Sequence, residues 1–118
     1  MAQNLMAASS GLPSVLVSQQ LTAAEVTQYT CPAASSAKLA AATVVNTTGA
    51  AVTVSISLVK SGATAGVANR VATFVLAAGD SSVVTELAGH FLGPGDFVSA
   101  IASTASAITL VLSGVVFS

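Results

Sequence analysis

Residues 92–113 read LGPGDFVSAIASTASAITLVLS and decide the fold class. The opening LGPGD predicts a sharp turn, because Gly adopts backbone conformations that other residues avoid and Pro fixes one dihedral angle. After this turn, apolar and small polar residues interleave over 97–102 and again over 107–113, on either side of a short polar loop at 103–106. Such alternation is typical of half-buried strands. The stretch therefore predicts the closing β-hairpin of a small all-β domain.

The rest of the chain repeats this pattern of short strands between turn signals. Alternation is strictest over 52–58 (VTVSISL), where Val, Ile and Leu lie on one face and Thr and Ser on the other,. Residues 46–50 (NTTGA) carry the Asn and Gly of a hairpin-type loop,. Sustained helical periodicity is not found. We expect one antiparallel β-sandwich or jelly-roll-like barrel of about eight strands over residues 14–118.

Residues 1–13 precede the first strand pattern and are small, polar and irregular. We expect them to form an extended N-terminal arm that lies across a neighbouring subunit. The candidate interface residues in this arm are Leu5, Met6, Leu12 and Pro13. The apolar residues here follow no basic segment, so the arm does not read as a secretory signal.

Composition favours association over catalysis or nucleic-acid binding. Charged residues make up 6% of the 118-residue chain and hydrophobic residues 53%, against about 25% charged residues in ordinary soluble domains. A net charge of −1 gives little repulsion between copies,. The basic residues Lys38, Lys60 and Arg70 are scattered, whereas a nucleic-acid partner requires clustered cations,. Residues 97–118 carry no charge and could span a bilayer, but their Ser and Thr content and alternation favour strands, so no membrane partner is expected,.

The residues capable of chemistry are few and isolated in sequence. Cys31 is the single cysteine, which excludes an intrachain disulfide and a cysteine zinc cluster and favours a buried, inert thiol,. His90 has no second histidine to complete a metal site,. Asp80 and Asp96 each follow a turn glycine, where a carboxylate accepts backbone N–H groups more readily than it binds calcium,. We expect no enzymatic activity, catalytic residue, cofactor or metal.

Residues 61–69 (SGATAGVAN) form the most exposed loop that the sequence predicts. Its small and polar residues offer an alternative function, a minor tail or tail-tip part or a host-surface, glycan-binding module. The candidate recognition residues in this loop are Ser61, Gly62, Thr64 and Asn69.

The order of several phrases resembles small accessory structural proteins of tailed bacteriophage virions. The phrases are residues 26–33 (VTQYTCPA), 46–49 (NTTG), 69–70 (NR), 76–80 (LAAGD) and 92–96 (LGPGD). The resemblance implies a non-enzymatic virion component, foremost a capsid-surface decoration or head-fibre protein. Such a protein assembles as a symmetric homo-oligomer, with a trimer favoured, and docks on the major capsid or tail proteins in a virion built in the host cytoplasm. Cys31 stands where these proteins usually have an aliphatic residue. A bacterial adhesin or pilus-like subunit is a further interpretation, which the missing export signal disfavours.

Overall fold

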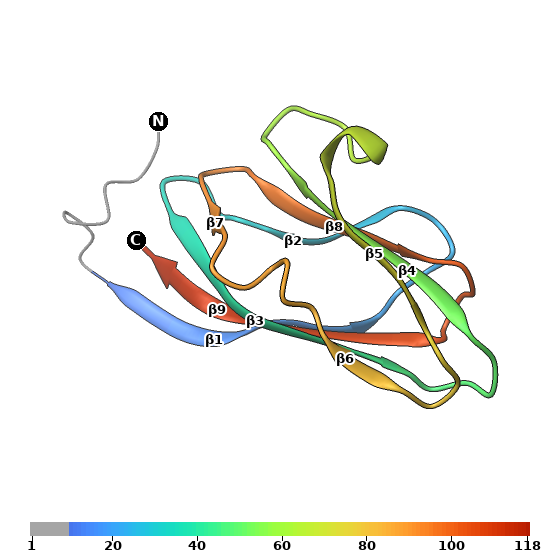
Figure 1. Ribbon diagram of the computed structural model, residues 1–118. Coiled ribbons are helices and arrows are strands. Elements are labelled where there is room, and N and C mark those ends of the chain that lie inside the picture. Colours follow the sequence, from blue (N-terminus) through green and yellow to red (C-terminus); the bar gives the residue numbers. More distant parts are fainter. Residues whose placement is uncertain (1–9) are drawn as a thin grey trace.

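The computed structural model describes residues 10–118 as two antiparallel β-sheets packed face to face (Figure 1). The one short helical segment that it places in this range is the 3-10 turn η2 (Val67–Asn69). The strands are β1 (Gly11–Gln20), β2 (Val26–Thr30), β3 (Ser36–Asn46), β4 (Val52–Val59), β5 (Arg70–Leu76), β6 (Ser81–Val83), β7 (Phe91–Leu92), β8 (Phe97–Ala102) and β9 (Ile108–Phe117). The predicted all-β sandwich is confirmed. No helix in the described range is long and apolar enough to cross a membrane.

The chain crosses repeatedly from one sheet to the other. Sheet A has the order β1-β9-β3-β6, with the short β7 also paired to β3, and sheet B has the order β2-β8-β4-β5. Since β6 and β7 both pair with β3, they share one position at the edge of sheet A. Two four-position sheets connected in this way form a jelly roll, one of the two arrangements that the sequence predicts.

The predicted closing hairpin is wrong, because β8 and β9 lie in different sheets. β8 pairs with β2 and β4, whereas β9 pairs with β1 and β3. The segment between them therefore crosses from one sheet to the other, and the same holds for residues 47–51 between β3 and β4. Turn chemistry fixes where a chain reverses but does not determine whether the next strand pairs beside the first or faces it.

The core lies between the sheets and is built from aliphatic side chains. Alternate residues of β8 and β9, such as Ala100 and Leu110, are completely buried and face the interior from opposite sides. The largest fully buried side chains are Leu21, Leu39, Val44, Val52, Val54, Ile56, Val59, Val84, Leu87, Ile108, Leu110 and Leu112. Aromatic residues stay at its margin, where Tyr29 and Phe74 are half-buried against this cluster.

Strand β1 begins at Gly11, three residues before the predicted start of the sandwich at residue 14. Leu12 and Pro13 therefore lie in the strand, paired with Val116 and Val115 of β9. Proline has no N–H to donate, so it fits a strand only at a sheet edge, and β1 is an edge strand of sheet A,. Leu5 and Met6, the other predicted interface residues, lie outside the described residues.

One buried amide holds the two sheets together where β3 ends. The side chain of Asn46 is 1% exposed. Its Nδ2 donates to the carbonyl of Ala50 at 2.7 Å and to those of Leu76 and Ala77 at 3.1 and 3.2 Å. Its Oδ1 accepts from the backbone N–H of Thr48 at 3.0 Å and from the Thr48 hydroxyl at 2.7 Å. Asn46 thus connects the end of β3 in sheet A to the start of β4 and the end of β5 in sheet B.

We predict that replacing Asn46 destabilises the fold more than replacing the less buried Asn69. Asn46→Ala leaves buried carbonyls without a donor and should lower the free energy of unfolding by about 2–3 kcal/mol. Asn46→Asp places an acceptor against three carbonyls and should be worse at neutral pH, with partial recovery in acid as the carboxyl gains a proton. Urea unfolding of each variant measures both effects.

The matched control is Asn69→Ala, which removes an amide that makes similar loop contacts in a more exposed setting. It should cost no more than about 1 kcal/mol. Equal losses for the two alanine variants would contradict the role given to Asn46.

Candidate functional site

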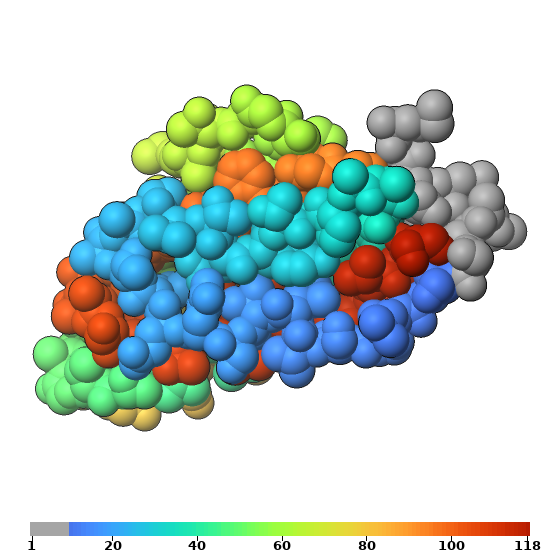
Figure 2. Space-filling model, turned by 180° about the vertical axis from the view of Figure 1, so that it is seen from behind, coloured from blue at the N-terminus to red at the C-terminus, as the bar shows by residue number. Residues whose placement is uncertain are grey.

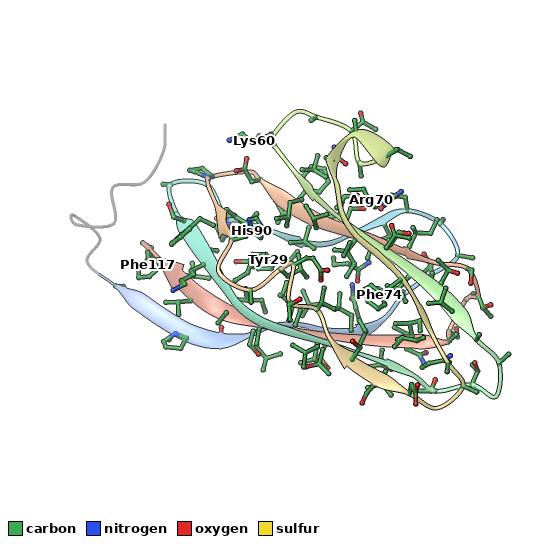
Figure 3. The ribbon with its side chains drawn as sticks, viewed as in Figure 1. Tyr29, Lys60, Arg70, Phe74, His90 and Phe117 are labelled. Atoms are coloured by element: carbon green, nitrogen blue, oxygen red, sulfur yellow. The ribbon has the colours of Figure 1, made fainter. Side chains whose placement is uncertain are left out.

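The most concentrated group of polar side chains lies on the outer face of sheet B. Arg70, at the start of β5 (Figure 3), donates through Nη1 to Glu25 Oε1 at 2.9 Å and to Ser57 Oγ at 3.0 Å. The Ser99 hydroxyl donates to Glu25 Oε2 at 2.8 Å. The side chains of Arg70 and Glu25 are 21% and 24% exposed, and Ser57 and Ser99 are buried beneath them. We call these four residues the Glu25–Arg70 cluster.

The register of sheet B brings this cluster together. Ser99 of β8 is paired with Ser57 of β4, and Ser57 with Arg70 of β5, so the three side chains form one row across the sheet. Glu25 closes the row from the segment before β2. Sequence analysis missed the cluster because its members are far apart in the chain. The only local signal was the outward position of Ser57 in its alternating strand.

The geometry of this cluster indicates a structural role. A nucleophilic serine needs a neighbouring base that is free to accept its proton. Here the carboxylate next to Ser99 is already paired with a guanidinium, and Ser57 accepts from the same guanidinium while donating to the Gly66 carbonyl at 3.4 Å. The ion pair therefore connects the segment before β2, at one edge of sheet B, to β5 at the other edge.

An open hollow of about 240 Å³ lies further along the same face of sheet B. Its lining residues are Ala23, Thr53, Ser55, Ile101, Ala102 and Ser103. They present hydroxyl and methyl groups and include no titratable side chain, so the hollow supplies neither an acid nor a base for catalysis.

The predicted recognition residues share one loop between β4 and β5, which protrudes from the sandwich (Figure 2). Asn69 is used inside the loop: its Oδ1 accepts from Gly66 N and its Nδ2 donates to the Thr64 carbonyl, both at 2.9 Å. Ser61, Gly62 and Thr64 are exposed. Their role in recognition stays a prediction.

The base of this loop is tied to the turn before β8 by Asp96. The Oδ1 of Asp96 accepts from Ser61 N at 2.9 Å, and its Oδ2 accepts from Gly93 N at 3.0 Å and lies 3.7 Å from Lys60 Nζ. The carboxylate of Asp96 thus accepts backbone N–H groups, as predicted. Asp80 contributes through its backbone, whose carbonyl accepts from Asn46 N at 2.8 Å.

Cys31 and His90 are not arranged as a nucleophile and base. Cys31 is 1% exposed, and its thiol donates weakly to the carbonyls of Ser35 and Leu92 at 3.5 and 3.7 Å. Burial raises the pKa of the Cys31 thiol, and the negative charge of Asp96 raises it further. His90 is exposed in the turn before β7. Within residues 10–118, no group of three or more His, Cys, Asp or Glu side chains is placed to hold a metal ion.

Comparison with known proteins gives a likeness of fold. No family model and no curated protein matches the sequence. A solved structure from work on Bacillus endospore appendages, described as a novel family of disulfide-linked pili, superposes with a TM-score of 0.50. The match covers 92% of this chain and 88% of the other, at 17% sequence identity. At that identity, the likeness defines a shared β-sandwich architecture and no more.

We predict that stability falls in alkali because of the Cys31 thiol. Its pKa is raised in the folded state, so the folded chain keeps a proton that the unfolded chain releases,. The contribution is complete below the ordinary thiol pKa of 9.0 and is lost as the pH rises past that value. Burial also raises the pKa of Tyr29, which adds a loss above its ordinary value of 10.0.

Urea unfolding at about pH 7 and about pH 9.5 tests this prediction. Wild type should lose stability between the two conditions, and Cys31→Ala should lose less. If the two proteins show the same pH dependence, Cys31 is not its source.

Proposed function

We propose that this chain is a non-enzymatic structural subunit that assembles with copies of itself into a larger particle. The observation that carries the proposal is the near absence of charge, with only three basic and four acidic residues in the chain. Large hydrophobic side chains nevertheless stand exposed on its strands, among them Val15, Val83 and Phe91. A protein with such a surface gains free energy when a partner covers it.

The polar groups of the described residues support a structural role. No buried side-chain nitrogen or oxygen between residues 10 and 118 lacks a hydrogen-bond partner. The charged groups of the Glu25–Arg70 cluster and of Asp96 form ion pairs within the fold or accept hydrogen bonds from its backbone N–H groups. These groups hold the sandwich in shape.

For the location of the subunit we propose the virion of a tailed bacteriophage, as a trimeric decoration of the capsid surface. The proposal is supported by the resemblance of the turn phrases at 46–49, 76–80 and 92–96 to accessory proteins of such virions. The N-terminal arm expected over 1–13 is the proposed contact to a neighbouring subunit or the major capsid protein, and its residues Gly11, Leu12 and Pro13 lie in β1. A minor tail position, with the loop 61–69 contacting the host surface, is the alternative.

A second candidate function is that of a subunit of a surface appendage, which the fold likeness to a pilus protein favours. Disulfides cannot join copies of this chain into a filament, however. A filament needs at least two linking thiols in each copy, whereas this chain has one, Cys31, and it is 1% exposed. Any polymer made of this chain alone is therefore held by non-covalent contacts.

We predict that the purified chain has the fixed mass of a closed oligomer, a multiple of three copies, by light scattering after size-exclusion chromatography. A version without residues 1–9 keeps all of β1 and should associate more weakly. A reducing agent should change neither mass.

Filaments that lengthen with protein concentration would favour the appendage subunit over the capsid decoration. A stable monomer in both versions would contradict self-assembly. In that case, binding to host envelope should be compared between wild type and a version with residues 61–69 replaced by a short turn.

A further inference from the structure

The two sheets present outer faces of different chemistry. The outer face of sheet B is rich in hydroxyl groups and carries the Glu25–Arg70 cluster. The outer face of sheet A, the lower layer in Figure 1, presents several large hydrophobic side chains among small polar ones. Its exposed members include Val15, Val83 and Phe91, which are 59%, 61% and 57% exposed. The half-buried Val111 and Val115 of β9 lie between them.

The register of sheet A places these residues in parallel rows across the strands. Pro13, Val115, Lys38 and Phe91 form one row. The next row along the strands contains Val15, Ser113 and Ala41, and the one after it contains Ser18, Val111, Thr43 and Val83. The middle row is the one with small residues at its centre, which permits another surface to approach closely.

Lys38 is the only charged residue in the described strands of sheet A. Its Nζ lies 5.9 Å from the centre of the Phe91 ring, so its aliphatic stem extends over the apolar row. A charged partner would find one cation and no anion on these strands. The face therefore fits a partner that is itself almost neutral, and a second copy of this chain has that property.

The size of the face also suits a second copy. β1 and β9 have ten residues each and β3 has eleven. At about 3.3 Å per residue and about 4.8 Å between strands, four strand positions give about 500–600 Å² per copy. Two copies then bury about 1,000–1,200 Å², which reaches the area of about 1,000 Å² expected of a specific interface.

We propose that two copies of this chain pack through the outer faces of sheet A, about a two-fold axis that runs across the strands along the Val15–Ser113–Ala41 row. This inference rests on the proposed self-assembly and names its contact surface. The axis places Phe91 of one copy opposite Val83 of the other, and the reverse, as a two-fold interface requires. It also faces Val115 with Val111 of the other copy.

This axis keeps the two Lys38 side chains apart. The Lys38 row of one copy faces the Thr43 row of the other, so the two ammonium groups are offset by about 13 Å along the strands. That offset exceeds the screening length of about 8–10 Å in physiological salt. An axis along the strands would instead bring the two cations together. Because the contact is two-fold, it doubles the mass of whatever assembles without it and so joins two of the proposed trimers.

The test introduces charges at Val15, because the proposed axis places Val15 of one copy opposite Val15 of the other. V15E and V15K each place like charges opposite each other and should halve the mass of the assembly in light scattering. An equimolar mixture of V15E and V15K should recover the wild-type mass, because unlike charges then meet. V75E and V75K are the matched controls, since Val75 is 65% exposed on the outer face of sheet B. They should keep the wild-type mass.

A second measurement uses cysteines and does not depend on weakening the assembly. Ser113→Cys places two thiols next to the axis, on sheets packed about 10 Å apart, and a thiol-specific crosslinker of about that length should join them into a covalent dimer. Ser55→Cys, a half-buried serine on the outer face of sheet B, should give no such dimer. The wild-type Cys31 is buried and does not compete.

The outcomes separate this inference from the proposed function. An oligomeric wild type whose mass is unchanged in V15E and V15K, with no S113C dimer, overturns the sheet A contact and leaves self-assembly standing. A wild type that is monomeric at high concentration overturns both. A third outcome is that V15E abolishes pairing in the version without residues 1–9, while the full chain does not pair. Residues 1–9 then cover the outer face of sheet A, and the inference is overturned for the full chain.

Discussion

Five hydrogen bonds from the side chain of Asn46 fix how one sheet sits over the other. A sandwich core of Val, Leu and Ile is almost without directional preference, because burial of apolar area rewards many relative placements of two sheets. Hydrogen bonds to buried backbone groups are directional and costly to lose. By binding the start of β4 and the end of β5 from the end of β3, Asn46 selects one placement at that end of the sandwich. Asp96 does the same near the other end, where it ties the turn before β8 to the β4–β5 loop.

The sequence was informative about local structure because local structure depends on neighbouring residues. Alternation over 52–58 assigned the buried face of β4, and the Gly-Asp turn at 95–96 indicated the backbone bonds of Asp96. Strand pairing depends on residues far apart, and there the hairpin expected from β8 and β9 was wrong. The Glu25–Arg70 cluster could not be predicted for the same reason. Its members at 25, 57, 70 and 99 become neighbours only through the order β2-β8-β4-β5. The start of β1 was placed late because Pro13 reads as a strand breaker unless the strand is known to lie at an edge.

The charged side chains of the described residues serve mainly to hold the fold. Charges are few, and those in the Glu25–Arg70 cluster and at Asp96 are committed to the fold. The two outer faces then differ: sheet B carries many hydroxyl groups and an ion pair, whereas sheet A carries exposed aliphatic and aromatic side chains among small polar ones, with Lys38 as the only charge in its strands. In the contact proposed through sheet A, this difference between the faces orients each subunit as it joins the assembly.

The position of β9 in the middle of sheet A has a consequence for how the protein is made. β9 is the last strand in the chain, yet it separates β1 from β3, so Val17 of β1 pairs with Leu112 and Thr43 of β3 with Val111. Chains emerge from the ribosome with the N-terminus first. Sheet A therefore cannot close until β9 has been synthesised, because a chain that stops short of β9 leaves β1 and β3 without their shared neighbour. Such pairing between distant segments slows folding. It also means that the surface of sheet A is complete only in copies whose translation has reached residue 117.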